Sequence, residues 1–95
     1  MNLDPQEMAQ EVRRAFSQAL LEIRTERQMS QEALAAGAGL DRTTLSLFER
    51  GLRQPTLTTL LLLARELGID PHELLARFLR CLGKAEAHPP RPKRS

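Results

Sequence analysis

The chain has 95 residues, of which 41% are hydrophobic, and its formal net charge is +2. This length suits one small globular domain, and this hydrophobic content excludes a wholly disordered chain. The single cysteine, Cys81, excludes an internal disulfide, and no apolar run reaches the roughly 18 residues of a membrane span, so we expect a protein of the reducing cytoplasm.

The charge is unevenly distributed along the chain. Residues 83–95 hold four basic residues and one acid, so the rest of the chain carries a net charge of −1. This last stretch also has three prolines and no apolar face, which is typical of a disordered basic tail. We therefore expect a folded domain at residues 1–82 and a disordered tail at residues 83–95. Contact with a polyanion must come from a local patch or from this tail.

The first two helices are predicted from their start signals and their periodicity. The stretch "DPQE" at residues 4–7 predicts a helix start, with Asp4 as the N-cap and proline at the first helical position. Apolar residues then recur at three- and four-residue steps as far as Ile23, which predicts one amphipathic helix over about residues 5–28. Ser30 predicts the cap of a second helix over residues 31–36, which "GAG" would end.

Three further helices follow. Asp41 predicts the N-cap of the third helix, and Gly51 its left-handed C-terminal cap. The stretch "LTTLLLLAREL" predicts a fourth helix, which Gly68 closes. A second Asp-Pro pair then starts a fifth helix, whose apolar residues continue to Leu82. No period-two alternation indicates a strand, so the expected fold is all-α with five helices.

The second and third helices are joined by a short turn that contains glycine, which is the spacing of a helix-turn-helix. The chain carries "SQEALA" on the second helix, glycine in the turn, "FERG" at the end of the third helix, proline before the fourth, and then "LAREL" and "GI". This ordered set resembles the Cro and lambda-repressor-type helix-turn-helix domain, the XRE family, from about Phe16 to Phe78. The resemblance implies a lambda-repressor-like DNA-binding domain and a transcriptional regulator.

In this motif the third helix lies in the DNA major groove, and its N-terminal residues touch base edges. The side chains expected to face DNA there are those of Arg42, Thr43, Ser46 and Leu47. Arg42 can pair bidentately with guanine, and Thr43 and Ser46 can hydrogen-bond to bases or contact a thymine methyl. Leu47 departs from the polar residue that many family members have there, and it could contact a thymine methyl.

The resemblance also implies roles for residues around the third helix. Gln31 lies where the family's glutamine contacts a phosphate and braces the recognition helix. Thr44 and Arg53 lie where family members contact backbone phosphates. Arg24 and Glu49 match the family's buried ion pair, which ties the first helix to the third.

The leucines of the last two helices indicate a partner. The run "LLLL" at residues 60–63 covers all sides of a helix, so at least one leucine must face away from the core. We expect this to be Leu62, because the family usually has a polar residue there. The fifth helix adds Phe78, Leu79 and Leu82 beyond the family core. Exposed apolar surface on a small domain indicates association, so we expect a homodimer interface at Leu62, Phe78, Leu79 and Leu82.

No set of residues indicates catalysis or metal binding. His72 and His88 each lack a second ligand at metal spacing, and no nucleophile–base set occurs, so we expect no enzyme, no metal and no cofactor. The favoured interpretation is a dimeric repressor of a pseudo-palindromic, double-stranded DNA site. Two alternatives stay open: a protein-interaction module of a larger regulatory complex, and an antitoxin. In either, the leucine-rich C-terminal surface could bind a protein partner.

Overall fold

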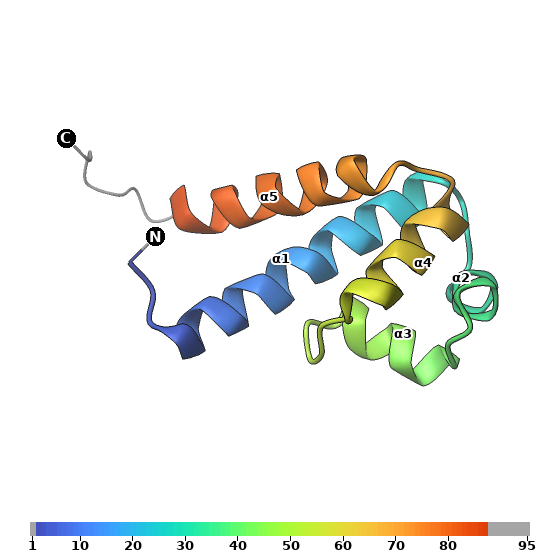
Figure 1. Cartoon of the computed structure of the whole chain (residues 1–95), viewed down its shortest axis with the longest axis horizontal. Helices are drawn as coiled ribbons and strands as arrows, with labels where there is room; N and C mark the ends of the chain where they lie inside the picture. The colour runs from blue at the N-terminus through green and yellow to red at the C-terminus, as the bar shows by residue number, and fades with distance from the viewer. Residues whose placement is uncertain (1, 88–95) are drawn as a thin grey trace.

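The molecule consists of a long helix pair and three shorter helices packed at one end of it. A computed structural model describes residues 2–87, with side chains through Gly83. The helices are α1 (Pro5–Glu26), α2 (Gln31–Ala38), α3 (Arg42–Glu49), α4 (Leu57–Leu67) and α5 (Pro71–Ala87). α1 and α5 lie side by side and antiparallel, and α3 lies on the opposite side of α1 from α5 (Figure 1). Residues 2–87 contain no strand, which confirms the all-α, five-helix fold.

Side-chain caps set where the helices begin. The Asp4 carboxylate accepts a hydrogen bond of 2.8 Å from the Glu7 amide, and the Asp4 amide donates one of 3.0 Å to the Glu7 carboxylate. Ser30, Asp41 and Thr56 likewise accept hydrogen bonds from amides in the first turns of α2, α3 and α4. These caps satisfy amides that the start of a helix leaves without a backbone partner, so local sequence predicts the helix starts well.

The end of α2 differs from the sequence prediction. Gly37 lies inside the helix, which ends instead at the left-handed Gly39, with a φ of +73°. A β-carbon on Gly37 would collide with the side chain of Glu66, which lies on α4. Glu66 is a flexible side chain that a larger residue would displace, so the packing of α4 fits a glycine at this position without requiring one, and α2 continues through it.

The domain boundary expected at residue 83 falls inside a helix. α5 continues through Gly83 and ends at Ala87. A glycine inside a helix costs only about 1 kcal/mol relative to alanine, so one such residue does not force the helix to end. The rest of the expected basic tail, residues 88–95, lies outside the described residues.

The core is aliphatic and lies where α1 meets the shorter helices. Three α1 side chains, Phe16, Leu20 and Ile23, are buried in it. The other buried members come from all four remaining helices and the α4–α5 turn: Leu34, Ala35, Ala38, Leu45, Phe48, Leu63, Ala64, Leu67, Ile69 and Leu74. Burial of this apolar cluster is the main force that positions α3 on α1.

A second, smaller cluster joins α1 to α5 beyond the core. Ala15 and Ala19 of α1 are buried against Cys81 and Leu82 of α5. Alanine side chains are small, so the two helices can approach closely here. The expectation that Leu82 is available to a second chain is therefore wrong, because this side chain is only 6% exposed.

The four-leucine run of α4 is also oriented differently from the expectation. Leu62 packs partly against the core, whereas Leu61 is 53% exposed. Helical geometry gives the reason. Leu61 lies about 200° around the helix from the buried Leu63, whereas Leu62 lies only about 100° from it. Leu61, not Leu62, is the leucine of this run that faces solvent.

We expect Leu20→Ala to lower the free energy of unfolding by about 2–5 kcal/mol, because it leaves a cavity in the core. Leu20 is fully buried, whereas its neighbour Leu21 is 42% exposed. Leu21→Ala is the matched control, with the same change in helix propensity, and should cost less than about 1 kcal/mol. Urea unfolding followed by circular dichroism measures both values. Equal losses would show that the buried face of α1 is wrongly assigned.

Candidate nucleic-acid interface

The outward side of α3 is polar and open. Its side chains and the first residue of α2 line a hollow of about 420 Å³, formed by Gln31, Arg42, Thr43, Ser46 and Arg50. On the opposite side of the same helix, Leu45 and Phe48 are buried in the core. This division follows from the 3.6-residue period, which separates the two sets of residues around the helix axis. α3 is thus held by its apolar side and presents its polar side to solvent.

A buried ion pair joins α1 to the end of α3. Arg24 Nε donates a hydrogen bond of 2.6 Å to Glu49 Oε2, and Arg24 Nη2 donates one of 3.0 Å to Glu49 Oε1. The remaining guanidinium nitrogen, Nη1, donates one of 2.7 Å to the Met29 carbonyl oxygen. The two side chains are 13% and 4% exposed. Charges removed from water need such partners, so the pair fixes α3 against α1 and against the turn before α2.

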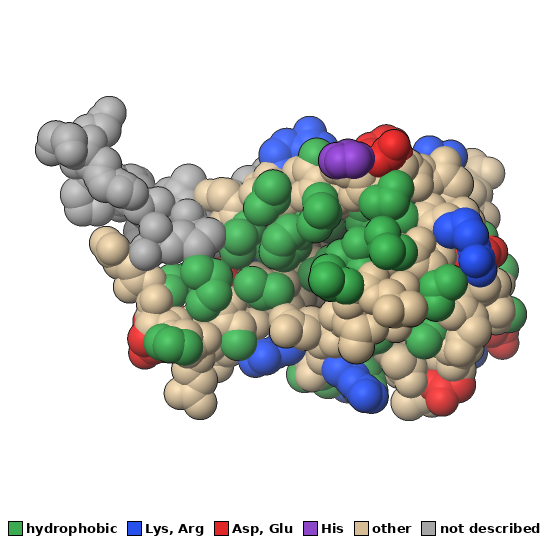
Figure 2. Space-filling view, viewed as in Figure 1, with side chains coloured by type: hydrophobic (Ala, Val, Ile, Leu, Met, Phe, Trp, Pro, Cys, Tyr) green, Lys and Arg blue, Asp and Glu red, His purple; other side chains and the backbone are tan. Residues whose placement is uncertain are grey.

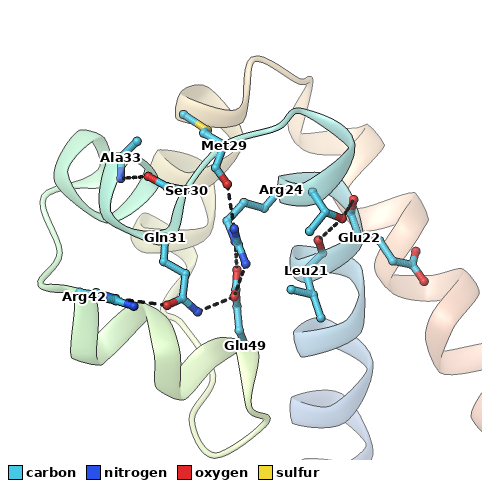
Figure 3. Close-up of polar contacts among 10 residues, drawn as sticks. Leu21, Glu22, Arg24, Met29, Ser30, Gln31, Ala33, Arg42 and Glu49 are labelled. Carbon is cyan, nitrogen blue, oxygen red and sulfur yellow. Dashed lines mark hydrogen bonds and ion pairs between the residues drawn. The ribbon is translucent and has the colours of Figure 1, made fainter.

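The same carboxylate connects the buried pair to the surface of α3 (Figure 3). Gln31 Nε2 donates a hydrogen bond of 2.8 Å to Glu49 Oε1. An ionised carboxylate only accepts, so this bond sets the orientation of the Gln31 amide. The Gln31 Oε1 atom then accepts a hydrogen bond of 3.4 Å from Arg42 Nε. Glu32 adds a carboxylate oxygen 3.7 Å from Arg42 Nη1. Arg42 is therefore held at one end of the hollow by residues of α2.

The start of α3 is also electrostatically defined. The Thr44 amide donates a hydrogen bond of 2.7 Å to Asp41 Oδ1. This bond lowers the pKa of Asp41 below its ordinary value, and the Thr44 hydroxyl and the more distant charge of Arg53 lower it further. Asp41 thus stays ionised at the N-terminus of α3, where a negative charge is favourable.

Four of the seven residues expected to contact DNA line the hollow. The other three lie around it. Thr44 and Leu47 are half-buried on α3, and Arg53 is exposed in the loop that follows. The structure therefore brings Gln31, Arg42, Thr43 and Ser46 of the predicted set onto one open face, and places Leu47 outside the hollow.

Two residues of this surface were not assigned from the sequence. Arg50 lines the hollow four residues after Ser46, so helical spacing alone could have placed it on the same face. Glu32 contacts Arg42 from a different helix. No local signal reveals this contact, because it depends on how the turn brings the starts of α2 and α3 together.

The part of the chain that the structure describes contains neither a cluster of metal ligands nor a helix that could span a membrane. No group of three or more histidine, cysteine, aspartate or glutamate residues within residues 2–87 could hold a metal ion. Over the same range, every helix is too short or too polar to cross a lipid bilayer.

The chain matches one protein family and is similar in sequence to a curated repressor. The helix-turn-helix family HTH_3 matches residues 20–74. The chain is 34% identical over 61 residues to the cryptic phage CTXphi transcriptional repressor RstR of Vibrio cholerae. This alignment covers 64% of the chain and 55% of RstR, so the chain spans about half the length of that repressor.

Two solved structures are similar in both sequence and fold. The restriction-modification controller protein C.AhdI of Aeromonas hydrophila is 45% identical, with a TM-score of 0.63 over 65% of this chain and 94% of that one. The restriction-modification controller protein C.Esp1396I, solved as a tetramer in complex with its natural 35 base-pair operator, is 30% identical. Its TM-score is 0.69 over 75% of this chain and 93% of that one.

We expect Glu49→Gln to lower the free energy of unfolding by about 3 kcal/mol, because it leaves the buried Arg24 charge without a carboxylate. Glu11→Gln is the matched control. Glu11 pairs with Arg14 at 3.1 Å on a more exposed part of α1, and its loss should cost less than about 1 kcal/mol. Chemical unfolding of both variants is the measurement. A Glu49 variant as stable as the Glu11 variant would show that the buried pair does not hold α3 to α1.

Proposed function

Because this chain belongs to the helix-turn-helix family HTH_3, whose members are DNA-binding transcriptional regulators, we propose that it binds a specific double-stranded DNA operator through α3 and regulates transcription. The observation that carries this proposal is the hollow on α3. Its lining contains two arginines and three neutral hydrogen-bonding side chains, and no carboxylate. This composition complements the acceptor-rich base edges of the major groove and the phosphates beside it.

Arg42 is the residue proposed to read a base. It lies in the first turn of α3, and the motif places this turn against base edges. Its guanidinium can donate two parallel hydrogen bonds to O6 and N7 of guanine. In the free protein, its contacts with Gln31 and Glu32 are long, at 3.4 and 3.7 Å. These contacts keep the Arg42 side chain near the groove-facing side of α3 and are weak enough for a base to replace them. The side chain therefore loses less conformational entropy when DNA binds.

Phosphate contacts are proposed to set the position of α3 on the duplex. The Gln31 amide uses one N–H on Glu49, and its second N–H is available to a phosphate oxygen. Gln31 is the first residue of α2, so the helix dipole also favours an anion there. Thr44 and Arg53, near the start of α3, are proposed to contact the phosphates on the other side of the groove.

A homodimer is the second part of the proposal. The relative C.Esp1396I assembles on its operator as a tetramer. In this chain, Leu75 and Leu79 lie one turn apart on α5 and are 41% and 57% exposed. Leu75 also borders a hollow of about 180 Å³, which is lined by Val12, Phe16, Gln54, Pro55, Leu60, Leu75 and Phe78. Figure 2 shows hydrophobic side chains gathered over α1, α4 and α5 on this face.

The proposed dimer surface differs in part from the sequence expectation. Leu79 remains in it, and Phe78 lies half-buried at its floor, with its ring centroid 6.4 Å from that of Phe16. Leu75 takes the place that was expected for Leu82. A two-fold interface here would be self-complementary and would leave both copies of α3 free for successive major grooves about 34 Å apart.

The alternatives are less well supported. An interaction module that had lost DNA reading would not need a carboxylate-free, arginine-containing hollow on α3. The described relatives are a transcriptional repressor and controller proteins, which favours a regulator over an antitoxin. A protein partner for the leucine-rich surface, other than a second copy, has no support in these comparisons. The relatives come from bacteria, in which such regulators meet their DNA in the cytoplasm, so we propose the same location for this chain.

We expect Arg42→Ala to weaken binding to the operator by roughly 1–3 kcal/mol and to relax the preference at one base pair, because a bidentate contact with guanine is lost. The operator is first selected from random duplex fragments, and affinities are then measured by fluorescence anisotropy. Arg65→Ala is the control, since Arg65 is an exposed arginine of α4 paired with Glu66. An equal loss on operator and random DNA would demote Arg42 to a phosphate contact.

We expect the double variant Leu75→Glu, Leu79→Glu to be a folded monomer that binds the operator weakly, because it places charge where apolar surface must pair. Sedimentation velocity at micromolar concentration measures the state of assembly. Leu21→Glu is the control, at a leucine of similar exposure (42%) that does not line the apolar hollow. A monomeric wild type, or a dimer that survives the double change, would refute this interface.

A further inference from the structure

We propose that Arg13 of α1 contacts a DNA phosphate, which extends the DNA-binding surface beyond the helix-turn-helix; this inference rests on the proposed function. Arg13 precedes residue 20, where the match to the family begins. The family motif therefore does not include it, and the case for this contact comes from charge pairing and packing in the structure.

The first observation concerns the charge partners of the arginines. Half of the arginines within residues 2–83 lie within 4.0 Å of a carboxylate oxygen: Arg14, Arg24, Arg42, Arg65 and Arg77. The others make no side-chain hydrogen bond or ion pair with a described residue: Arg13, Arg27, Arg50, Arg53 and Arg80. Of these, Arg13, Arg50 and Arg53 belong to two segments that touch each other at Gly51.

Gly51 is the point where the turn after α3 meets α1. It adopts a left-handed φ of +73°, and a β-carbon on it would lie 3.7 Å from the Arg13 carbonyl oxygen and 3.6 Å from Ser17 Oγ. Arg50 directly precedes Gly51, and Arg53 follows two residues later. The backbone of Arg13 is therefore in contact with the segment that carries the other two unpartnered arginines.

Helical spacing places the Arg13 side chain on the side of α1 that faces α3. Arg13, Ser17, Leu20 and Arg24 follow one another at steps of four, three and four residues, which forms one stripe along the helix. At one end of this stripe Arg24 bonds to Glu49, and in the middle Ser17 lies beside the Gly51 turn. α1 continues past the end of α3 (Figure 1), and Arg13 is half-exposed there.

This position suits a phosphate. With α3 in the major groove, Arg50 lies in the hollow that faces the groove, and Arg13 lies beyond the end of α3 on the adjoining part of α1. Figure 2 shows lysine or arginine side chains along the edge of the molecule on which α3 lies. A guanidinium without a carboxylate partner can form paired hydrogen bonds with phosphate oxygens. Such a contact adds affinity and carries no base preference.

The test compares the salt dependence of DNA binding by the wild type and by Arg13→Ala, on operator and on random duplex. Each neutralised phosphate contributes about 0.9 to the slope of log affinity against log salt. We therefore expect the slope per bound chain to fall by about 0.9 on both duplexes, with binding about eightfold weaker per chain near 0.1 M salt. Arg13→Lys keeps the charge and should restore most of the slope.

Arg80→Ala is the matched control. Arg80 is an exposed arginine without a described partner on α5, and α1 separates α5 from α3 (Figure 1). Its removal changes net charge equally and should leave the slope unchanged. Alanine favours helix, so the Arg13 variant should keep its helical circular dichroism. An unchanged slope for Arg13→Ala, or an equal fall for Arg80→Ala, would overturn the contact. A wild type that binds no duplex would instead overturn the proposed function.

Discussion

The carboxylate of Glu49 is the group on which the arrangement of this domain depends. It accepts two hydrogen bonds from Arg24 and one from Gln31, so it links α1, the start of α2 and the end of α3. A buried ion pair is a weak source of net stability, because removing both charges from water is costly. Its value here is geometric. It fixes where the end of α3 lies against α1, and it orients the Gln31 amide, which in turn contacts Arg42.

α1 is the element that relates the two proposed binding surfaces. One side of it packs on α3 through Arg24 and the Gly51 turn, and another packs on α5 through Ala15 and Ala19. The polar face of α3 and the apolar face over α5 thus lie on different parts of the molecule (Figure 2). DNA binding and dimer formation therefore need not compete for the same side chains, as a palindromic operator requires.

The arginines of this chain differ in whether they have a carboxylate partner. Arg77, on α5, bonds to Glu22 and Glu26 of α1, and this contact lowers the pKa of Glu26. Arginines at the end of α3 and in the loop after it have no such partner among the described residues. Arg24 and Arg77 join helices through carboxylates, whereas the unpaired Arg13, Arg50 and Arg53 lie where a polyanion is proposed to bind. The small net charge of the chain conceals this difference, because it is a matter of position and not of number.

Local sequence determined the five helices, because their caps and apolar periods act within a few residues of each helix. Together with the ordered motif, it also indicated the polar face of α3. What it left undecided depended on contacts between segments far apart in the chain. The local pattern predicts a helix stop at Gly37, whereas α2 continues through this residue. It also predicts that Leu62 is exposed, whereas the orientation of α4 packs Leu62 partly against the core. Leu82 was expected to be available to a second chain, whereas in the fold it packs against Ala15 and Ala19 of α1. The partners of Arg42 and the position of Arg13 were settled in the same way, because a side chain's neighbours across the fold follow from packing and not from its place in the sequence.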